Sequence, residues 1–251
     1  MEEARFFKRG EEVGTKPWVM TQQWQDTVFL HWPVSPQWIR KFIPEELELD
    51  VWKGTAWIGI VLFKAVGMRP RFLPPIPSIK NYLELNVRTY VKFNGKSGVY
   101  FLSLDADSWL AVEATTKTKF LPYRHARMEM SKWNGQYIFK SHRTHKNSFP
   151  ESLKLHYKII SGTIRKNAFE YWATERYCLW TKPKDRLVRV DIVHSPWVLK
   201  YIEGEIHWNS MASFLPDSLH QSRPISHFGG TQKVRFLPPA VENKKTEEFP
   251  K

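Results

Sequence analysis

The stretch Tyr82 to Met128, YLELNVRTYVKFNGKSGVYFLSLDADSWLAVEATTKTKFLPYRHARM, decides the predicted fold, and its first ten residues alternate between two kinds of side chain. The mainly apolar set comprises Leu83, Leu85, Val87, Thr89 and Val91, and the other comprises Tyr82, Glu84, Asn86, Arg88 and Tyr90. A period of two places these sets on opposite faces of a β-strand. The apolar face can pack a core, while the polar face either meets solvent or lines a cavity inside a barrel. We favour the cavity.

Turn signals extend this strand into a sheet. Asn94-Gly95 and Asn134-Gly135 predict tight hairpins. Helices are expected over 109–118 and from Ser195-Pro196 to about Ile202. Strands after the quoted stretch are expected at 137–143, 153–160, 169–180 and 187–193. The predicted fold is mainly β (α+β), an antiparallel barrel with a few short helices.

The chain has 251 residues and no Gly/Ser-rich linker, which predicts a single domain over 17–240. A polar lead-in over 1–16 precedes it, and a charged tail over 241–251, expected to be disordered, follows it. Cys178 is the single cysteine, which excludes an internal disulfide and favours a reducing, cytoplasmic location. The sequence contains neither an apolar run long enough for a membrane helix nor a secretion signal, so no membrane association is expected.

The formal net charge of +13 bears on partners more than on fold. It is compatible with an anionic ligand or with nucleic acid. No zinc-finger spacing, RRM signature or basic-leucine-zipper pattern accompanies the positive residues, so solvated faces plus a small anionic ligand are favoured over nucleic acid. The nine histidines show no metal-ligand spacing, and no Walker loop, Rossmann fingerprint or hydrolase elbow is present. We therefore expect no metal and no cofactor, and a homo-oligomer remains compatible with the sequence.

Several segments resemble the YqjF-like family of uncharacterised bacterial proteins. The segments are His31-Trp32-Pro33-Val34, Gly54 to Gly59, Glu84 to Val91, Leu104-Asp105-Ala106, Leu121-Pro122-Tyr123 and Glu175-Arg176-Tyr177. That family is similar in turn to acetoacetate decarboxylase, a cone-shaped β barrel with a central cavity. The resemblance implies the same barrel here, with the polar face of the strand in its lumen, and implies no established activity.

The resemblance to the decarboxylase also implies roles for individual residues. Glu84 matches the cavity carboxylate of that enzyme, Tyr123 stands where the Schiff-base lysine would be, and Arg124 stands where its cationic neighbour would be. Because a phenol cannot form an imine, Schiff-base decarboxylation is expected to be lost at this position. Neither Lys117 nor Lys119 occupies the motif position.

These residues give a candidate site with two open interpretations. As an enzyme, the protein would use Glu84 and Tyr123 for proton transfer, while Arg88, Arg124, Asn86 and His125 bind an organic acid. As a binding or sensing module, it would hold the same ligand without turnover. Each residue also has a purely structural interpretation: Glu84 and Arg88 as an ion pair, Tyr123 as a buried aromatic residue, and His125 as a half-exposed histidine. Because successive strand residues face opposite ways, Tyr123 and Arg124 can share a cavity only if Pro122 bends the chain.

Overall fold

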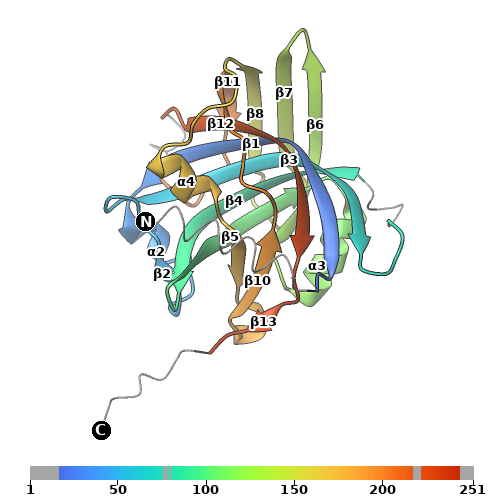
Figure 1. The fold of residues 1–251 in the computed structure, drawn as a ribbon, viewed down its shortest axis with the longest axis vertical. Coiled ribbons are helices and arrows are strands. Elements are labelled where there is room, and N and C mark those ends of the chain that lie inside the picture. Colours follow the sequence, from blue (N-terminus) through green and yellow to red (C-terminus); the bar gives the residue numbers. More distant parts are fainter. Residues whose placement is uncertain (1–16, 76–78, 80, 217–221, 244–251) are drawn as a thin grey trace.

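The computed structural model describes residues 17–75, 79, 81–216 and 222–243. Its β-strands are β1 (Met20–Val34), β2 (Glu48–Leu49), β3 (Ala56–Pro70), β4 (Asn81–Phe93), β5 (Lys96–Ala106), β6 (Tyr123–Trp133), β7 (Gln136–Arg143), β8 (Ser152–Ile159), β9 (Cys178–Thr181), β10 (Val188–Val193), β11 (Lys200–Asn209), β12 (Ile225–Phe236) and β13 (Ala240–Val241). The helices are α2 (Pro36–Arg40), α3 (Trp109–Thr118), α4 (Ala168–Thr174) and the short 3₁₀ turn η2 (Pro183–Asp185). The mainly β class predicted from the sequence is therefore correct (Figure 1).

The strands pair into one sheet that closes on itself. Its order is β13-β10-β9-β5-β6-β7-β8-β11-β12-β1-β3-β4-β2, and β4 also pairs with β5 while β10 also pairs with β12. One closed ring therefore runs β4-β5-β6-β7-β8-β11-β12-β1-β3, and a second runs β4-β5-β9-β10-β12-β1-β3. Closure leaves few unpaired strand edges. The barrel is mainly antiparallel, with parallel pairing of β5 to β6 and to β9.

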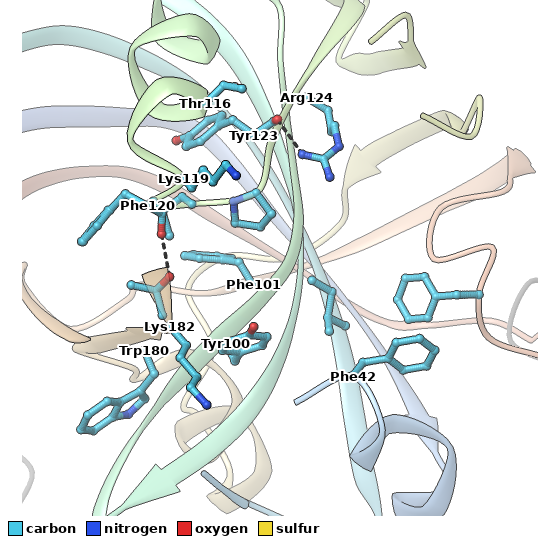
Figure 2. Close-up of a pocket in the computed structure, with 15 residues that line it drawn as sticks. Phe42, Tyr100, Phe101, Thr116, Lys119, Phe120, Tyr123, Arg124, Trp180 and Lys182 are labelled. Carbon is cyan, nitrogen blue, oxygen red and sulfur yellow. Dashed lines mark hydrogen bonds between the residues drawn. The ribbon is translucent and has the colours of Figure 1, made fainter. Parts of the chain in front are cut away.

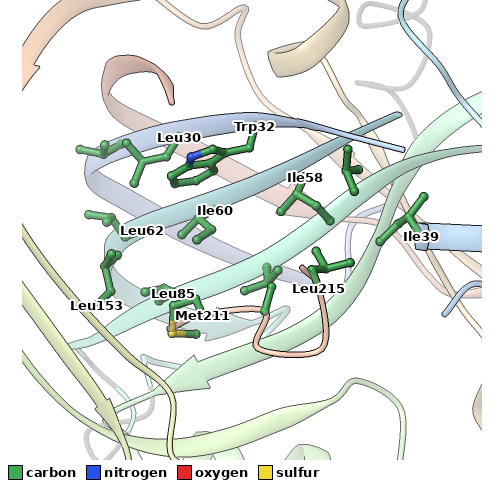
Figure 3. Packing of buried hydrophobic residues seen from close by; sticks show 14 of the residues in the cluster. Leu30, Trp32, Ile39, Ile58, Ile60, Leu62, Leu85, Leu153, Met211 and Leu215 are labelled. Atoms are coloured by element: carbon green, nitrogen blue, oxygen red, sulfur yellow. The ribbon is translucent and has the colours of Figure 1, made fainter. Parts of the chain in front are cut away.

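The two rings enclose separate interiors on the two sides of β1, β3 and β4, whose central residues are buried on both faces. Toward the first ring they present aliphatic side chains that form the main hydrophobic core, shown in Figure 3: Leu30, Ile58, Ile60, Leu62 and Leu85. Toward the second ring β1 and β3 present Phe29, Val61 and Phe63. On β4 the residues facing this second interior are polar instead, and this is what positions the site.

Two secondary-structure predictions are wrong. Residues 169–174 belong to helix α4 rather than to a strand, because Asn167 caps the backbone N–H of Glu170 (3.0 Å) while the Glu170 carboxylate accepts from the N–H of Asn167 (2.7 Å). The predicted helix from Ser195 to Ile202 is also absent. The carbonyls of Leu199 and Tyr201 instead accept hydrogen bonds from the N–H groups of Ile164 and Ile160.

The ends of the predicted domain are only partly described. Residues 1–16 of the lead-in and 244–251 of the tail lie outside the described residues. At the start of the predicted tail, Val241 belongs to β13, and the N–H of Glu242 bonds to the carbonyl of Leu187 (2.9 Å). In the part of the chain that is described, no helix combines the length and the apolar character needed to cross a bilayer.

Candidate functional site

The predicted polar face of β4 lines an enclosed cavity in the second ring. Glu84, Asn86 and Arg88 are 5 %, 4 % and 9 % exposed, and all three line a cavity of about 80 Å³ together with Tyr123 from β6. The rest of the lining is largely apolar, with Phe29, Val61, Leu104, Leu179 and Ile192 among its side chains. The alternation of β4 thus sends one set of residues into the hydrophobic core and the other into this space.

Glu84 and Tyr123 form a buried acid–base pair. The phenol of Tyr123 donates a hydrogen bond to Oε2 of Glu84 (2.9 Å). Burial disfavours the carboxylate and raises the pKa of Glu84 to about 7, although the bond from Tyr123 opposes this effect. Burial and the neighbouring Glu84 charge raise the pKa of Tyr123 well above its usual value. Near neutral pH the pair therefore consists of a carboxyl group close to its midpoint and a protonated phenol that donates to it.

The phenol of Tyr123 has a second neighbour, Tyr82, which is tied into the wall of the cavity. The side-chain Nε2 of Gln22 donates to the Tyr82 hydroxyl (3.0 Å), and the Trp24 indole donates to the side-chain Oε1 of Gln22 (2.9 Å). Burial and the charge of Glu84 raise the pKa of Tyr82 above its ordinary value. These bonds fix the position of the Tyr82 phenol beside Tyr123.

Arg88 is a buried cation without a partner of opposite charge. Its Nη2 donates to the carbonyl of Ala173 (3.2 Å) at the end of α4, and its Nε is buried without a hydrogen bond. Among the described residues Arg88 forms no ion pair, and four residues of extended strand separate it from Glu84 by roughly 13 Å along the chain. The structural ion pair considered for Glu84 and Arg88 is therefore absent. A buried charge of this kind is costly unless something neutralises it.

Besides Gln22, three polar residues that the sequence did not single out as site residues line the cavity. Arg176 pairs with Asp50 (Nη1 to Oδ2, 2.5 Å), but its Nη2 is buried without a partner. Nδ1 of His194 donates to the carbonyl of Ser195 (2.8 Å), and burial lowers the pKa of His194. Thr174 follows Ala173 at the end of α4. The cavity therefore contains a second guanidinium and a neutral imidazole.

Arg124 and His125, predicted to bind the ligand, do not line this cavity. Arg124 faces a separate, wider pocket on the other side of Tyr123 and donates from Nη1 to the Tyr123 carbonyl (3.0 Å). His125 lies 3.3 Å from Glu113 and stacks on His145. Strand alternation in β6 turns Arg124 away from the side that Tyr123 takes. His125 lies on the same side of the strand as Tyr123, but it contacts Glu113 and His145 instead of the cavity.

The lining also bears on the chemistry of the site. Among the described residues that line the cavity there is no lysine. Lys119 lines the wider pocket instead, and Lys117 is exposed on α3. What the cavity offers is a carboxyl group with a pKa near neutrality, a phenol and an unneutralised guanidinium. Such a set can bind an anion and move a proton.

The closed β structure with this internal polar cavity places the protein in the acetoacetate decarboxylase-like class of folds. An acetoacetate decarboxylase-like enzyme from Sphingomonas wittichii RW1 has a TM-score of 0.63 at 10 % identity, covering 91 % of this chain and 95 % of that one. The enduracididine biosynthesis enzyme MppR, complexed with the condensation product of pyruvate and imidazole 4-carboxaldehyde, has a TM-score of 0.62 at 13 % identity, with 90 % of each chain covered. At these identities the likeness concerns the fold alone.

Sequence comparison then gives the family. Residues 21–231 match the model of DUF2071, described as an uncharacterized conserved protein. The uncharacterized protein YqjF of Bacillus subtilis (strain 168) is 40 % identical over 237 residues, which cover 93 % of this chain and 97 % of YqjF. The chain belongs to this family of YqjF-like proteins, as the resemblance of its motifs implied.

Proposed function

We propose that the protein binds a small organic acid in the cavity, with Arg88 as the anion anchor, and catalyses a proton transfer on it with Glu84 and Tyr123, without an imine intermediate. The observation that carries this proposal is the buried guanidinium of Arg88, which has an unpartnered Nε and no ion pair among the described residues. A carboxylate ligand would supply the missing charge and accept that free N–H. Asn86, between Glu84 and Arg88 on the same face of β4, is placed to contact the middle of such a ligand.

The acid–base pair is suited to removing a proton beside a carbonyl group. With a pKa of about 7, Glu84 can accept a proton from the ligand as the carboxylate and return it as the acid at neutral pH. Tyr123 keeps its proton throughout and donates its hydrogen bond to Glu84, which stabilises the carboxylate form. The fold is compatible with keto-acid chemistry, because the MppR structure of the same class contains a condensation product of pyruvate.

A non-catalytic binding module is the second candidate. One observation favours it: no described lining residue is a lysine, which agrees with the family resemblance that puts Tyr123 at the position of the decarboxylase's reactive amine. On this alternative the same anion binds at Arg88, and Glu84 contributes only to ligand selection.

Two measurements with pyruvate as the probe test the proposal. By calorimetry, Arg88→Met should weaken pyruvate binding at least about 10-fold, whereas Arg127→Met, an exposed arginine on β6, should leave it unchanged. Because Arg88→Met removes a buried charge that no described carboxylate neutralises, it should also keep or raise the melting temperature, and a retained melting temperature would exclude unfolding as the cause. Unaltered binding in Arg88→Met refutes the anion site.

Exchange of the pyruvate methyl protons in D₂O, followed by proton NMR, tests the proton transfer. The wild-type protein should accelerate the exchange, and Glu84→Gln should slow it about 100-fold or more. If Glu84→Gln leaves the exchange unchanged while pyruvate still binds at Arg88, the binding module is the correct function.

A further inference from the structure

A second, wider pocket lies directly outside the cavity. It has a volume of about 450 Å³ and is formed by β5, the α3–β6 connection and β9, with Phe42 on its far side (Figure 2). Three residues line both spaces: Phe101, Leu121 and Tyr123. Tyr123 is half-buried although its hydroxyl bonds to the buried Glu84, so this side chain forms part of the partition between the two spaces. We name this space the outer pocket and the space around Glu84 the inner cavity.

The walls of the outer pocket are rich in aromatic rings. Besides Tyr123, the lining rings belong to Phe42, Tyr100, Phe101, Phe120, Trp180 and Phe214. Phe42 and Phe214 come from distant parts of the chain and pack at a centroid distance of 4.4 Å. Flat apolar walls of this kind favour an aromatic ligand, because rings bury large areas and stack against one another.

The charges in the outer pocket are all positive. Lys119, Arg124 and Lys182 line it, and no carboxylate appears among its described lining residues. Lys182 is paired with Glu46 (2.7 Å), whereas Lys119 and Arg124 form no ion pair within the described residues. Figure 2 shows Lys119 and Arg124 on the same side of the pocket as Tyr123. The two unneutralised cations therefore flank the partition to the inner cavity.

The chain fixes this wall locally. Lys119 takes a left-handed conformation (φ 51°) at the end of α3, which turns the chain toward Phe120 and Leu121. The Thr181 hydroxyl on β9 then donates to the Phe120 carbonyl (2.6 Å). The positions of the cations and of the partition are thus set by the end of α3 and by a hydrogen bond from β9 to the α3–β6 connection.

We propose that the outer pocket binds the aromatic body of the ligand whose acidic head occupies the inner cavity, and that this body carries a second anionic group directed at Lys119 and Arg124. The inference rests on the proposed function of the inner cavity and names its substrate class: an aryl-substituted keto acid with a further anionic group. The volumes support it, because about 80 Å³ accommodates only a head of a few heavy atoms, while about 450 Å³ accommodates a ring system. The head enters the inner cavity when Phe101 and Leu121 of the partition rotate aside, while Tyr123 keeps its hydrogen bond to Glu84.

Three ligands with one keto-acid head test the inference by calorimetry at low salt: pyruvate, phenylpyruvate and 4-carboxyphenylpyruvate. Phenylpyruvate should bind about 10-fold more tightly than pyruvate, and 4-carboxyphenylpyruvate should bind about 3- to 10-fold more tightly than phenylpyruvate. The double variant Lys119→Gln/Arg124→Gln should remove the gain of 4-carboxyphenylpyruvate over phenylpyruvate. The matched control Lys117→Gln/Arg127→Gln, with the same loss of charge at exposed neighbours on α3 and β6, should retain it.

The outcomes separate the two proposals. If pyruvate binds in an Arg88-dependent manner but the ring adds nothing, the outer-pocket inference is wrong and the proposed function stands. The outer-pocket inference is equally wrong if both double variants lose the gain of the second carboxylate to the same extent, since general charge would then explain it. If none of the three acids binds, both proposals fail.

Discussion

Replacing Glu84 with glutamine should stabilise the protein at alkaline pH and leave it unchanged in acid. Glu84 has a pKa of about 7 in the folded protein against an ordinary 4.5, because its carboxylate is buried among largely apolar side chains. Between these values the folded state binds more protons at this site than the unfolded chain does. The free energy of unfolding therefore falls as pH rises through that window, and the loss is complete above about pH 7.

The size of the effect follows from the same two values. At about 1.4 kcal/mol per pKa unit, a pKa near 7 in place of 4.5 corresponds to a loss of about 3 kcal/mol above neutrality. Glu84→Gln removes the titrating group but keeps an oxygen that can accept the bond from Tyr123. The free energy of unfolding of the variant should therefore equal that of wild type near pH 4.5 and be up to about 3 kcal/mol higher at about pH 8.

Urea denaturation of both proteins across this pH range measures the difference directly. Other groups that titrate here, such as Asp105 with a pKa raised to about 6 by burial, contribute equally to both proteins and cancel. Glu48→Gln, at an exposed position on β2, serves as the control and should show no such divergence. If the difference in free energy of unfolding between Glu84→Gln and wild type does not change with pH, Glu84 is not a buried group with a raised pKa.

Two further changes probe the same site. Tyr123→Phe removes the hydrogen bond that favours the Glu84 carboxylate, so the pKa of Glu84 should rise above about 7. Carbon NMR of the Glu84 carboxyl group measures this pKa, and a fall in the pKa would contradict the assigned contact. Asn167→Ala removes the cap of α4, whose Ala173 carbonyl accepts the hydrogen bond from Arg88. It should lower the free energy of unfolding, measured by urea denaturation, by about 1 kcal/mol and weaken pyruvate binding, whereas Asn167→Asp should retain the stability and the affinity. Equal losses in the two variants would exclude the cap as the cause.

The site residues of β4 could be placed on one face from the sequence because strand alternation is a local rule, whereas Arg124 and His125 of β6 do not line the cavity as predicted. Strict alternation puts Glu84, Asn86 and Arg88 on one face whatever the rest of the fold does. The same rule separates Tyr123 from Arg124. The sequence favoured the cavity over solvent for that face, and the family resemblance then implied the same, although alternation alone is equally compatible with a wet surface.

The remaining site residues depend on contacts between distant segments. Arg176 reaches the cavity because Asp50, 126 positions earlier, holds its guanidinium. His194 lies in a segment whose Ser-Pro-Trp sequence imitates a helix start, and pairing of Leu199 and Tyr201 with 160–164 prevents that helix. One local signal was available for α4: Asn167 and Glu170 have the spacing of a capping box, which outweighs the apparent strand pattern of Phe169 and Tyr171.

The polar face of β4 makes the strongest argument that the cavity is a binding site and not a packing defect. The other face of the same strand shows that apolar residues fit this sheet, since Leu85 and Val87 are fully buried in the main core. Placing Glu84 and Arg88 on the cavity side instead leaves a carboxyl group with a displaced pKa and an unneutralised guanidinium, each a burden on the order of several kcal/mol. A neutralising ion pair between them would relieve both, yet the strand holds them apart. An anion bound beside Arg88 would neutralise the guanidinium, and a proton exchanged with that ligand would use the raised pKa of Glu84.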